Sequence, residues 1–157
     1  MFLVFLLFTS SLNTNLTNTL FLAFSLVFDV DGVRSIRRKL LIEGRTMGFV
    51  PTMGALHSGH LKLMDRAQME TDVAIASIFV NPTQFSAGED LDKYPRPLDR
   101  DIELLEKAGV DILFLPDHHT VYPENALCHV EPVAFSHISE GKARPDFFRG
   151  MYLNHIT

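Results

Sequence analysis

The chain of 157 residues is long enough for one domain, and its 14 Lys+Arg against 19 Asp+Glu give a formal net charge of −5. This acidic balance offers no general reason to bind nucleic acid or an anionic membrane. The single cysteine, Cys128, excludes an intramolecular disulfide and therefore a disulfide-stapled secreted domain.

Residues 1–28 are mostly apolar and contain no Asp, Glu, Lys, Arg or His. The apolar stretches Met1–Phe8 and Leu20–Phe28 are both shorter than the roughly 18 residues of a membrane span. A secretory signal needs a basic first region, but the first basic residue is Arg34. We interpret 1–28 as an apolar leader of uncertain status: a non-native leader, a weak signal or anchor, or a folded part of the domain. The expected location is cytoplasmic, with membrane association or secretion through 1–28 as the alternative.

From Asp29 onward, the spacing of apolar residues predicts helices and strands in alternation. The predicted helices are Val33–Glu43, Gly59–Thr71 and Leu98–Ala108, and the predicted strands are Thr46–Val50, Val73–Val80 and Ile112–Leu115. This order predicts an α/β fold with a parallel sheet and flanking helices. Ligands bind such sheets beyond the carboxyl ends of the strands. We therefore expect Pro51–His60 and Asn81–Phe85 to lie on one rim.

The segment PTMGALHSGH, Pro51–His60, leaves a strand and enters a helix. Gly54 and Gly59 let the backbone approach a ligand closely, and unpaired N–H groups at a helix start favour phosphate. His57 and His60 are three residues apart, so they face the same side of one helical turn. Two imidazoles can donate hydrogen bonds to phosphate oxygens that gain charge in a transition state. The alternative is a surface turn with incidental histidines.

The segment NPTQF, Asn81–Phe85, places the amide of Gln84 directly after a buried strand. An amide can bond hydroxyl and carboxylate groups, and the alternative is a glutamine in a solvated loop. The acidic loop Glu89–Arg96 is more simply a solvated loop than a magnesium site, and we assign no metal site. Asp99 and Asp101, at a helix start, are interpreted as partners of the helix dipole.

Residues from about Val33 to Gly150 resemble the pantothenate synthetase family, the pantoate–β-alanine ligases. The matching blocks are GFVPTMGALHSGH (Gly48–His60), SIFVNPTQF (Ser77–Phe85), EDLDKYPRPLDRD (Glu89–Asp101), GVDILFLPDHHTVYP (Gly109–Pro123) and EGKARPDFFRG (Glu140–Gly150). The family belongs to the wider group of H-x-G-H nucleotidyltransferases. The resemblance implies a Rossmann-like nucleotide-binding domain over residues 29–150, followed by a divergent tail at 151–157, and a homodimer for the full-length family.

The resemblance also implies a reaction in two steps. Pantoate attacks the α-phosphorus of ATP, which brings Mg²⁺ with it, and gives pantoyl adenylate and pyrophosphate. The amine of β-alanine then attacks the acyl carbon, releasing pantothenate and AMP. The implied catalytic residues are His60, as proton donor, and His57. The family pattern implies ATP contacts from Met53, Gly54, Ala55, Leu56, His57, Ser58, Gly59 and His60. It implies pantoate and β-alanine contacts from Gln84, Pro51, Thr52 and Tyr94.

The sequence departs from the family after Gly150, where it reads Met151–Thr157, MYLNHIT. The family's later lysine-bearing G-x-K-D-x-Q-Q loop, its serine–arginine loop and its C-terminal domain do not follow. We therefore expect a truncated copy with an incomplete fold and impaired turnover. One alternative is a non-catalytic remnant that binds nucleotide or a full-length partner. Another is a different H-x-G-H nucleotidyltransferase, against which the NPTQF block argues.

Overall fold

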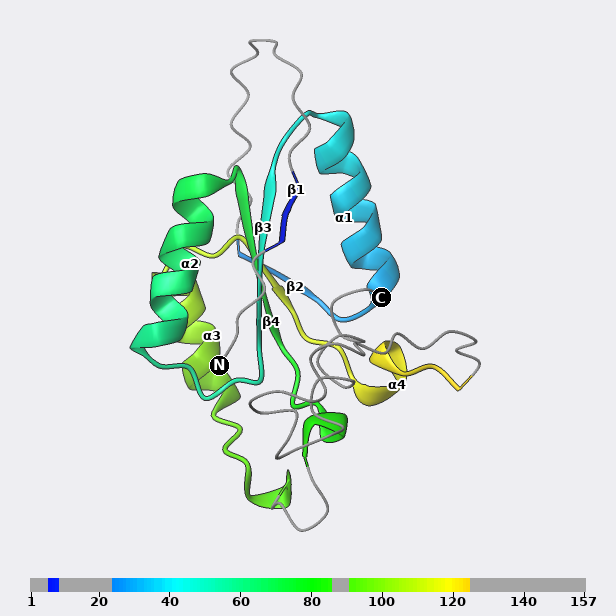
Figure 1. Ribbon diagram of the computed structural model, residues 1–157, viewed down its shortest axis with the longest axis vertical. Helices are drawn as coiled ribbons and strands as arrows, with labels where there is room; N and C mark the ends of the chain where they lie inside the picture. The colour runs from blue at the N-terminus through cyan, green and yellow to red at the C-terminus, as the bar shows by residue number, and fades with distance from the viewer. Residues whose placement is uncertain (1–5, 9–23, 86–90, 125–157) are drawn as a thin grey trace, which may run out of the picture. The chain divides into compact units, whose positions relative to one another are not determined.

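A computed structural model describes residues 6–8, 24–85 and 91–124 of the chain (Figure 1). The chain divides into two compact units, the first made of 1–79 and 96–116 and the second of 80–95 and 117–157. The rest of the apolar leader, Cys128, the block Glu140–Gly150 and the tail 151–157 lie outside the described residues. Within the described ranges, no helix is both long enough and apolar enough to span a membrane.

The first unit is built on a five-stranded sheet with the order β1-β3-β4-β5-β2. The strands are β1 (Leu6–Phe8), β2 (Ser25–Val27), β3 (Met47–Thr52), β4 (Val73–Ile78) and β5 (Ile112–Phe114). All neighbouring strands from β3 to β2 pair in parallel, and β1 pairs antiparallel to β3. The predicted α/β fold with a parallel, Rossmann-like sheet is confirmed.

Strand β2 lies in the segment that the sequence analysis assigns to the apolar leader. Leu26 and Val27 pair with Leu113 and Phe114 of β5, and the Leu115 N–H donates to the Val27 carbonyl at 2.8 Å. The sequence did not predict this strand because a continuous apolar run is as typical of a signal or anchor as of a buried parallel strand.

Three helices flank the sheet: α1 (Val30–Ile42), α2 (Ser58–Glu70) and α3 (Leu98–Lys107). Figure 1 shows α1 on one side of the sheet and α2 and α3 on the other. Helix α1 begins three residues earlier than predicted because Asp29 caps it, its carboxylate accepting from the Gly32 N–H at 2.7 Å. The predicted stop at Gly44 is confirmed, since Gly44 takes the left-handed conformation with φ +67° just past the helix.

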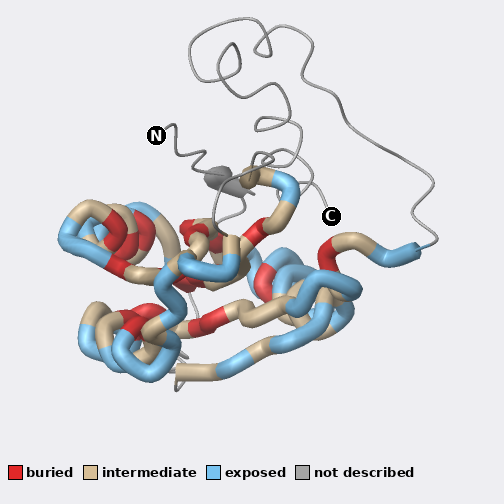
Figure 2. The backbone as a smooth tube through the Cα atoms, turned by 90° about the horizontal axis from the view of Figure 1, so that it is seen from below, coloured by how far each residue is buried: buried red, intermediate tan, exposed pale blue. Residues whose placement is uncertain are grey.

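The sheet has an apolar core on each face. Ala74 and Ala76 of β4 belong to the core that also contains residues of α2 and α3, whereas Val73 and Ile75 belong to the core that contains Leu40 of α1. Successive strand residues point to opposite faces, so the continuous apolar run of β4 is explained by burial on both. In Figure 2 the helices carry both buried and exposed residues, as expected for helices that cover a sheet with one side.

Strand β3 continues through Pro51 and Thr52, two residues beyond its predicted end. Proline has no N–H to donate to a ladder. Within the described residues the β1 pairing reaches only Phe49, so Pro51 lies beyond the segment of β3 that has a neighbour on that side. The extension carries Thr52 to the end of the strand, where the turn into α2 begins. Other predicted bounds agree to within two residues.

The second unit holds short elements among its described residues. These are the 3-10 turns Pro82–Gln84 and Leu91–Lys93 and the four-residue helix α4 (His118–Val121). His118 and His119 are both exposed.

A side-chain link fixes the starts of β3 and β4. The Asp72 carboxylate accepts from the backbone N–H and the hydroxyl of Thr46, both at 2.7 Å, and the Asp72 N–H donates to the Thr46 hydroxyl at 3.0 Å. These hydrogen bonds, the backbone one foremost, lower the pKa of Asp72 because they favour its charged form.

Replacing Asp72 by Asn is expected to lower the free energy of unfolding at pH 7 by about 1 kcal/mol, a modest value because the site is exposed. A carboxyl with a lowered folded pKa stabilises the fold above its unfolded pKa of about 3.9 and loses that stabilisation as the pH falls through the folded pKa. The difference in the free energy of unfolding between the variant and the unmodified protein, measured by urea unfolding, is therefore constant near neutral pH and disappears at acidic pH. Asp65→Asn, at an exposed position of α2, is the matched control. An equal deficit in both variants would contradict the assignment.

Candidate active site

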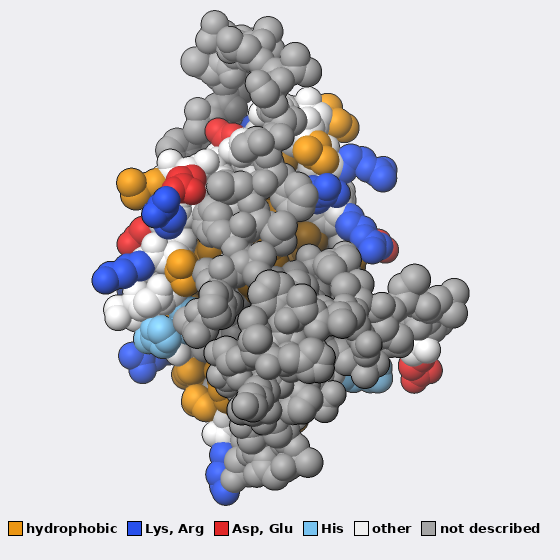
Figure 3. Space-filling view, viewed as in Figure 1, with side chains coloured by type: hydrophobic (Ala, Val, Ile, Leu, Met, Phe, Trp, Pro, Cys, Tyr) orange, Lys and Arg blue, Asp and Glu red, His pale blue; other side chains and the backbone are white. Residues whose placement is uncertain are grey.

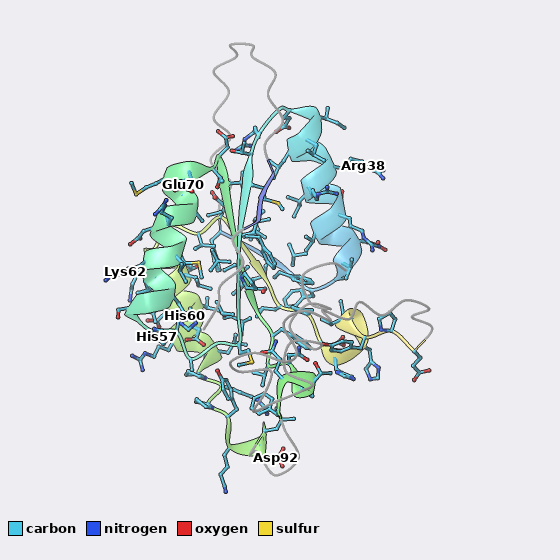
Figure 4. All side chains as sticks on the ribbon, in the orientation of Figure 1. Arg38, His57, His60, Lys62, Glu70 and Asp92 are labelled. Atoms are coloured by element: carbon cyan, nitrogen blue, oxygen red, sulfur yellow. The ribbon has the colours of Figure 1, made fainter. Side chains whose placement is uncertain are left out.

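The turn between β3 and α2 holds the two histidines of the H-x-G-H motif. His57 is the N-cap of α2, and its Nδ1 accepts from the Gly59 N–H at 3.1 Å. His60 Nδ1 accepts in turn from the His57 N–H at 3.4 Å. The ring centroids are 4.1 Å apart, which agrees with the spacing of the motif. Figure 4 shows both rings at the first turn of α2, and in the same view Figure 3 shows histidine colour at the surface there.

The hydrogen bonds determine which nitrogen of each ring carries the proton. A ring nitrogen that accepts a hydrogen bond has no proton of its own, so the neutral rings of His57 and His60 are protonated at Nε2. Neither Nε2 has a hydrogen-bond partner within the described residues. Both rings therefore have one N–H available to donate to a ligand.

The surroundings of His60 favour its neutral form. The residue is 9% exposed, and its burial lowers the pKa of the imidazole below the ordinary value of 6.5. The neighbouring His57 lowers the pKa of His60 further, whereas the carboxylate of Asp101 raises it and opposes these effects in part. At neutral pH, His60 is therefore a neutral hydrogen-bond donor through Nε2.

Side chains of the protein itself bond most of the backbone N–H groups of the turn, where the sequence predicts unpaired groups; the predicted contacts of the turn with ATP stay a prediction. Side chains accept hydrogen bonds from the N–H groups of Gly54, Ala55, Leu56, His57 and Gly59. Gly59 also serves the turn itself, since a Cβ there would lie 2.9 Å from the His57 ring. The physical reason is that His57, as the cap of α2, occupies the place at the helix start that a bound anion would take.

Asp101 is the residue of this site whose role the sequence analysis missed. It lies in the first turn of α3 and is 1% exposed, and its two carboxylate oxygens accept from the Ala55 N–H at 2.7 Å and the Leu56 N–H at 2.8 Å. Asp101 thus bonds the backbone of the turn, in addition to lying at the start of its own helix, where it interacts favourably with the helix dipole. The signal was its spacing: Asp101 precedes the buried Leu105 by four residues and so lies on the apolar face of α3.

Thr52 completes the support of the turn. Its hydroxyl donates to the Ser77 carbonyl at 2.8 Å and accepts from the Gly54 N–H at 3.1 Å. Gly54 has φ +81° and is followed by Ala55 at φ +51°, a left-handed conformation that costs a residue with a Cβ about 1–2 kcal/mol. Among the predicted ATP-binding residues, Leu56 has its side chain in the apolar core, while Ser58 is exposed.

Gln84 belongs to the second unit, at the end of the 3-10 turn Pro82–Gln84. Asn81 caps this turn and is fully buried; its side-chain oxygen accepts from the Thr83 N–H at 3.1 Å, the Thr83 hydroxyl at 2.9 Å and the Tyr122 hydroxyl at 2.9 Å. Gln84 is half-buried, and within the described residues its side chain makes no hydrogen bond. The network around Asn81 therefore fixes the backbone of the turn and leaves the Gln84 amide available.

The four residues predicted to contact pantoate and β-alanine divide between the units. Pro51 and Thr52 belong to the first, whereas Gln84 and Tyr94 belong to the second, where Tyr94 packs edge-on against Phe85 with ring centroids 5.6 Å apart. Their joint contribution to one pocket stays a prediction. In the described ranges, no group of three or more His, Cys, Asp or Glu side chains is placed to hold a metal ion.

Comparison with known proteins identifies the family. The family model described as Pantoate-beta-alanine ligase matches residues 25–153. The chain belongs to this family. The match starts at the first residue of β2, within the predicted leader, and ends within the predicted tail.

Curated members of the family are similar over most of this chain. The pantothenate synthetase of Thermodesulfovibrio yellowstonii is 50% identical over 119 residues, which are 76% of this chain and 42% of that protein. The enzyme of Francisella tularensis subsp. novicida is 48% identical over 124 residues, 78% of this chain and 47% of that protein. The chain thus spans about half the length of the curated relatives it matches.

A solved structure supports the same assignment. The pantoate-beta-alanine ligase from Francisella tularensis, complexed with Beta-gamma ATP and beta-alanine, superposes with a TM-score of 0.76 at 43% identity. The match covers 85% of this chain and 51% of that one. The match to this fold therefore extends over most of the chain.

The geometry of the two rings makes a prediction for the titration of His60. We expect NMR of the imidazole resonances to give a pKa for His60 below 6.5, and His57→Asn to raise it, because the variant removes the repulsion from His57. Asn is chosen because it also caps helices well. A pKa of His60 at or above 6.5, or one unmoved by the substitution, would contradict the description of the site.

Proposed function

We propose that this chain binds ATP with its Mg²⁺ at the turn between β3 and α2 and supports the adenylation of pantoate, the first step of pantothenate synthesis. The observation that carries the proposal is the pair of imidazoles. Both Nδ1 atoms are engaged by backbone N–H groups, so both Nε2–H groups are available as donors. Membership of the pantoate–β-alanine ligase family supplies the reaction.

In the adenylation step a carboxylate oxygen of pantoate attacks the α-phosphorus of ATP. The bond between the α-phosphorus and the bridging oxygen breaks, and pyrophosphate leaves with that oxygen. Negative charge grows on the phosphate oxygens during this exchange, and hydrogen bonds from the Nε2–H groups of His57 and His60 stabilise it. A neutral His60 donates a hydrogen bond without adding positive charge. The positive charge near the phosphates comes from the Mg²⁺ that ATP brings with it.

The second step joins β-alanine to the activated acyl group. Its amine attacks the acyl carbon of pantoyl adenylate, loses a proton, and releases AMP. We assign pantoate recognition to the Gln84 amide, which is capable of both donating to the pantoate carboxylate and accepting from a hydroxyl. Pro51, Thr52 and Tyr94 are proposed to line the same pocket. The β-alanine present in the complex of the Francisella tularensis enzyme supports this choice of substrate. The proposed location is cytoplasmic, and the homodimer is expected of the full-length family.

The second candidate function is nucleotide binding without turnover, with a full-length partner needed for catalysis. The two proposed donors to a phosphate lie in one turn of the first unit, whereas Gln84 and Tyr94, proposed for pantoate, belong to the second. The two candidates share the ATP site and differ in the chemical step.

The two candidates are separated by measuring ATP binding and adenylation on the same protein. We expect isothermal titration with Mg²⁺ and ATP to show binding that His60→Ala weakens about tenfold, or about 1.4 kcal/mol. Pantoate-dependent exchange of labelled pyrophosphate into ATP reports the first step alone, and His60→Ala is expected to slow it about 10²-fold. The affinity for β-alanine should change less than the adenylation rate.

The matched control is His119→Ala, which removes an exposed histidine from α4. Binding without pantoate-dependent exchange would establish the nucleotide-binding alternative. An unmodified chain that binds no ATP, or a His119→Ala variant as impaired as His60→Ala, would overturn the proposal.

A further inference from the structure

The carboxylate of Asp101 is a buried charge with an unusual set of partners. It is 1% exposed, and no Lys or Arg among the described residues forms an ion pair with it. A buried carboxylate is costly unless hydrogen bonds compensate for the lost water. Here the compensation comes from two consecutive backbone N–H groups, those of Ala55 and Leu56, one to each oxygen.

Those two N–H groups belong to the part of the turn that needs support most. Ala55 is the only described residue other than glycine with a positive φ, at +51°, and it follows Gly54 at +81°. A left-handed residue that carries a Cβ persists only where its surroundings hold it. A Cβ at Gly54 would lie 3.1 Å from the Asp101 carboxylate, so the backbone and the carboxylate are closely fitted.

The held backbone leads directly into the two imidazoles. Leu56 precedes His57, and the His57 N–H donates to His60 Nδ1. Asp101 fixes the direction of the peptide group before His57. That direction therefore sets where His57 caps α2 and where the His57 N–H, which donates to His60, lies. We propose that Asp101 is a positioning residue, which holds the turn in the conformation that presents the Nε2–H groups of His57 and His60 to a phosphate; this rests on the proposed function for the role of the rings.

A carboxylate is required for this task because both of its oxygens accept. An asparagine has the same shape but only one accepting oxygen, so its NH₂ group would face the second backbone N–H, donor against donor. Asp101→Asn therefore removes the clamp with little change in volume. Asp99→Asn is the matched control, because Asp99 lies in the same first turn of α3 and is exposed.

The test combines backbone hydrogen exchange with ATP titration on the full chain. In Asp101→Asn, we expect the N–H groups of Ala55 and Leu56 to exchange at least about tenfold faster, with protection in β4 retained. The affinity for ATP with Mg²⁺ should fall about tenfold, whereas Asp99→Asn should match the unmodified protein in both measurements. Unchanged exchange at Ala55 and Leu56, or an equal loss of protection throughout β4, would overturn the inference.

A second variant guards against a failure to fold. Glycine adopts a positive φ without a steric cost, so Ala55→Gly relieves the turn and compensates the stability lost in Asp101→Asn. The double variant should fold, keep fast exchange at Leu56 and still bind ATP weakly. If it binds ATP as tightly as the Ala55→Gly single variant, Asp101 does not position the site. If the unmodified chain binds no ATP, the proposed function fails, and the exchange at Ala55 and Leu56 alone decides whether Asp101 holds the turn.

Discussion

The chemistry open to this protein depends on two hydrogen bonds that His57 and His60 accept from backbone N–H groups. Each bond occupies Nδ1 and so assigns the proton of a neutral ring to Nε2. The site therefore offers side-chain donors at the helix start, where a phosphate-binding loop of the usual kind offers backbone N–H groups. This arrangement suits the stabilisation of charge that develops on phosphate oxygens, because the donors are fixed before the substrate arrives.

Three elements of the fold, β3, β4 and α3, hold the turn that carries the two histidines. Strand β3 delivers Thr52, whose hydroxyl joins the Ser77 carbonyl of β4 to the Gly54 N–H of the turn. Helix α3 delivers Asp101, which bonds the next two N–H groups. The turn is thus held by Thr52, which immediately precedes it, and by Asp101, which lies far from it in sequence. In the second unit, Asn81 performs a comparable task for the turn that ends at Gln84.

Most of the fold follows from local pattern, whereas the connections of the site do not. The apolar run of β4 predicted a buried strand, and the structure packs its alternate residues into two cores. The H-x-G-H spacing correctly suggested adjacent rings. Sequence did not distinguish a strand from a leader in β2, because pairing with β5 is a long-range event that an apolar run does not encode.

The same limit applies to charged and small residues of the site. Asp101 was interpreted from its place at a helix start, but its partners are 45 and 46 residues away in the chain. The contact of Gly59 with ATP stays a prediction, and the structure adds that this glycine makes room for the ring of His57. In both cases the residue type and its local position were informative, while the contact that gives it a role exists only after the sheet and helices have packed.

The Nε2–H groups of His57 and His60 are proposed to contact the phosphates of ATP. Long-range nitrogen–proton NMR of the histidine side chains, recorded while ATP with Mg²⁺ is added, tests it most directly. We expect both rings to be in the Nε2–H form before ATP is added, with ligand-dependent shifts at Nε2 of His57 and His60 and none at His119. Rings protonated at Nδ1, or resonances of His57 and His60 that ATP leaves unchanged, would contradict it.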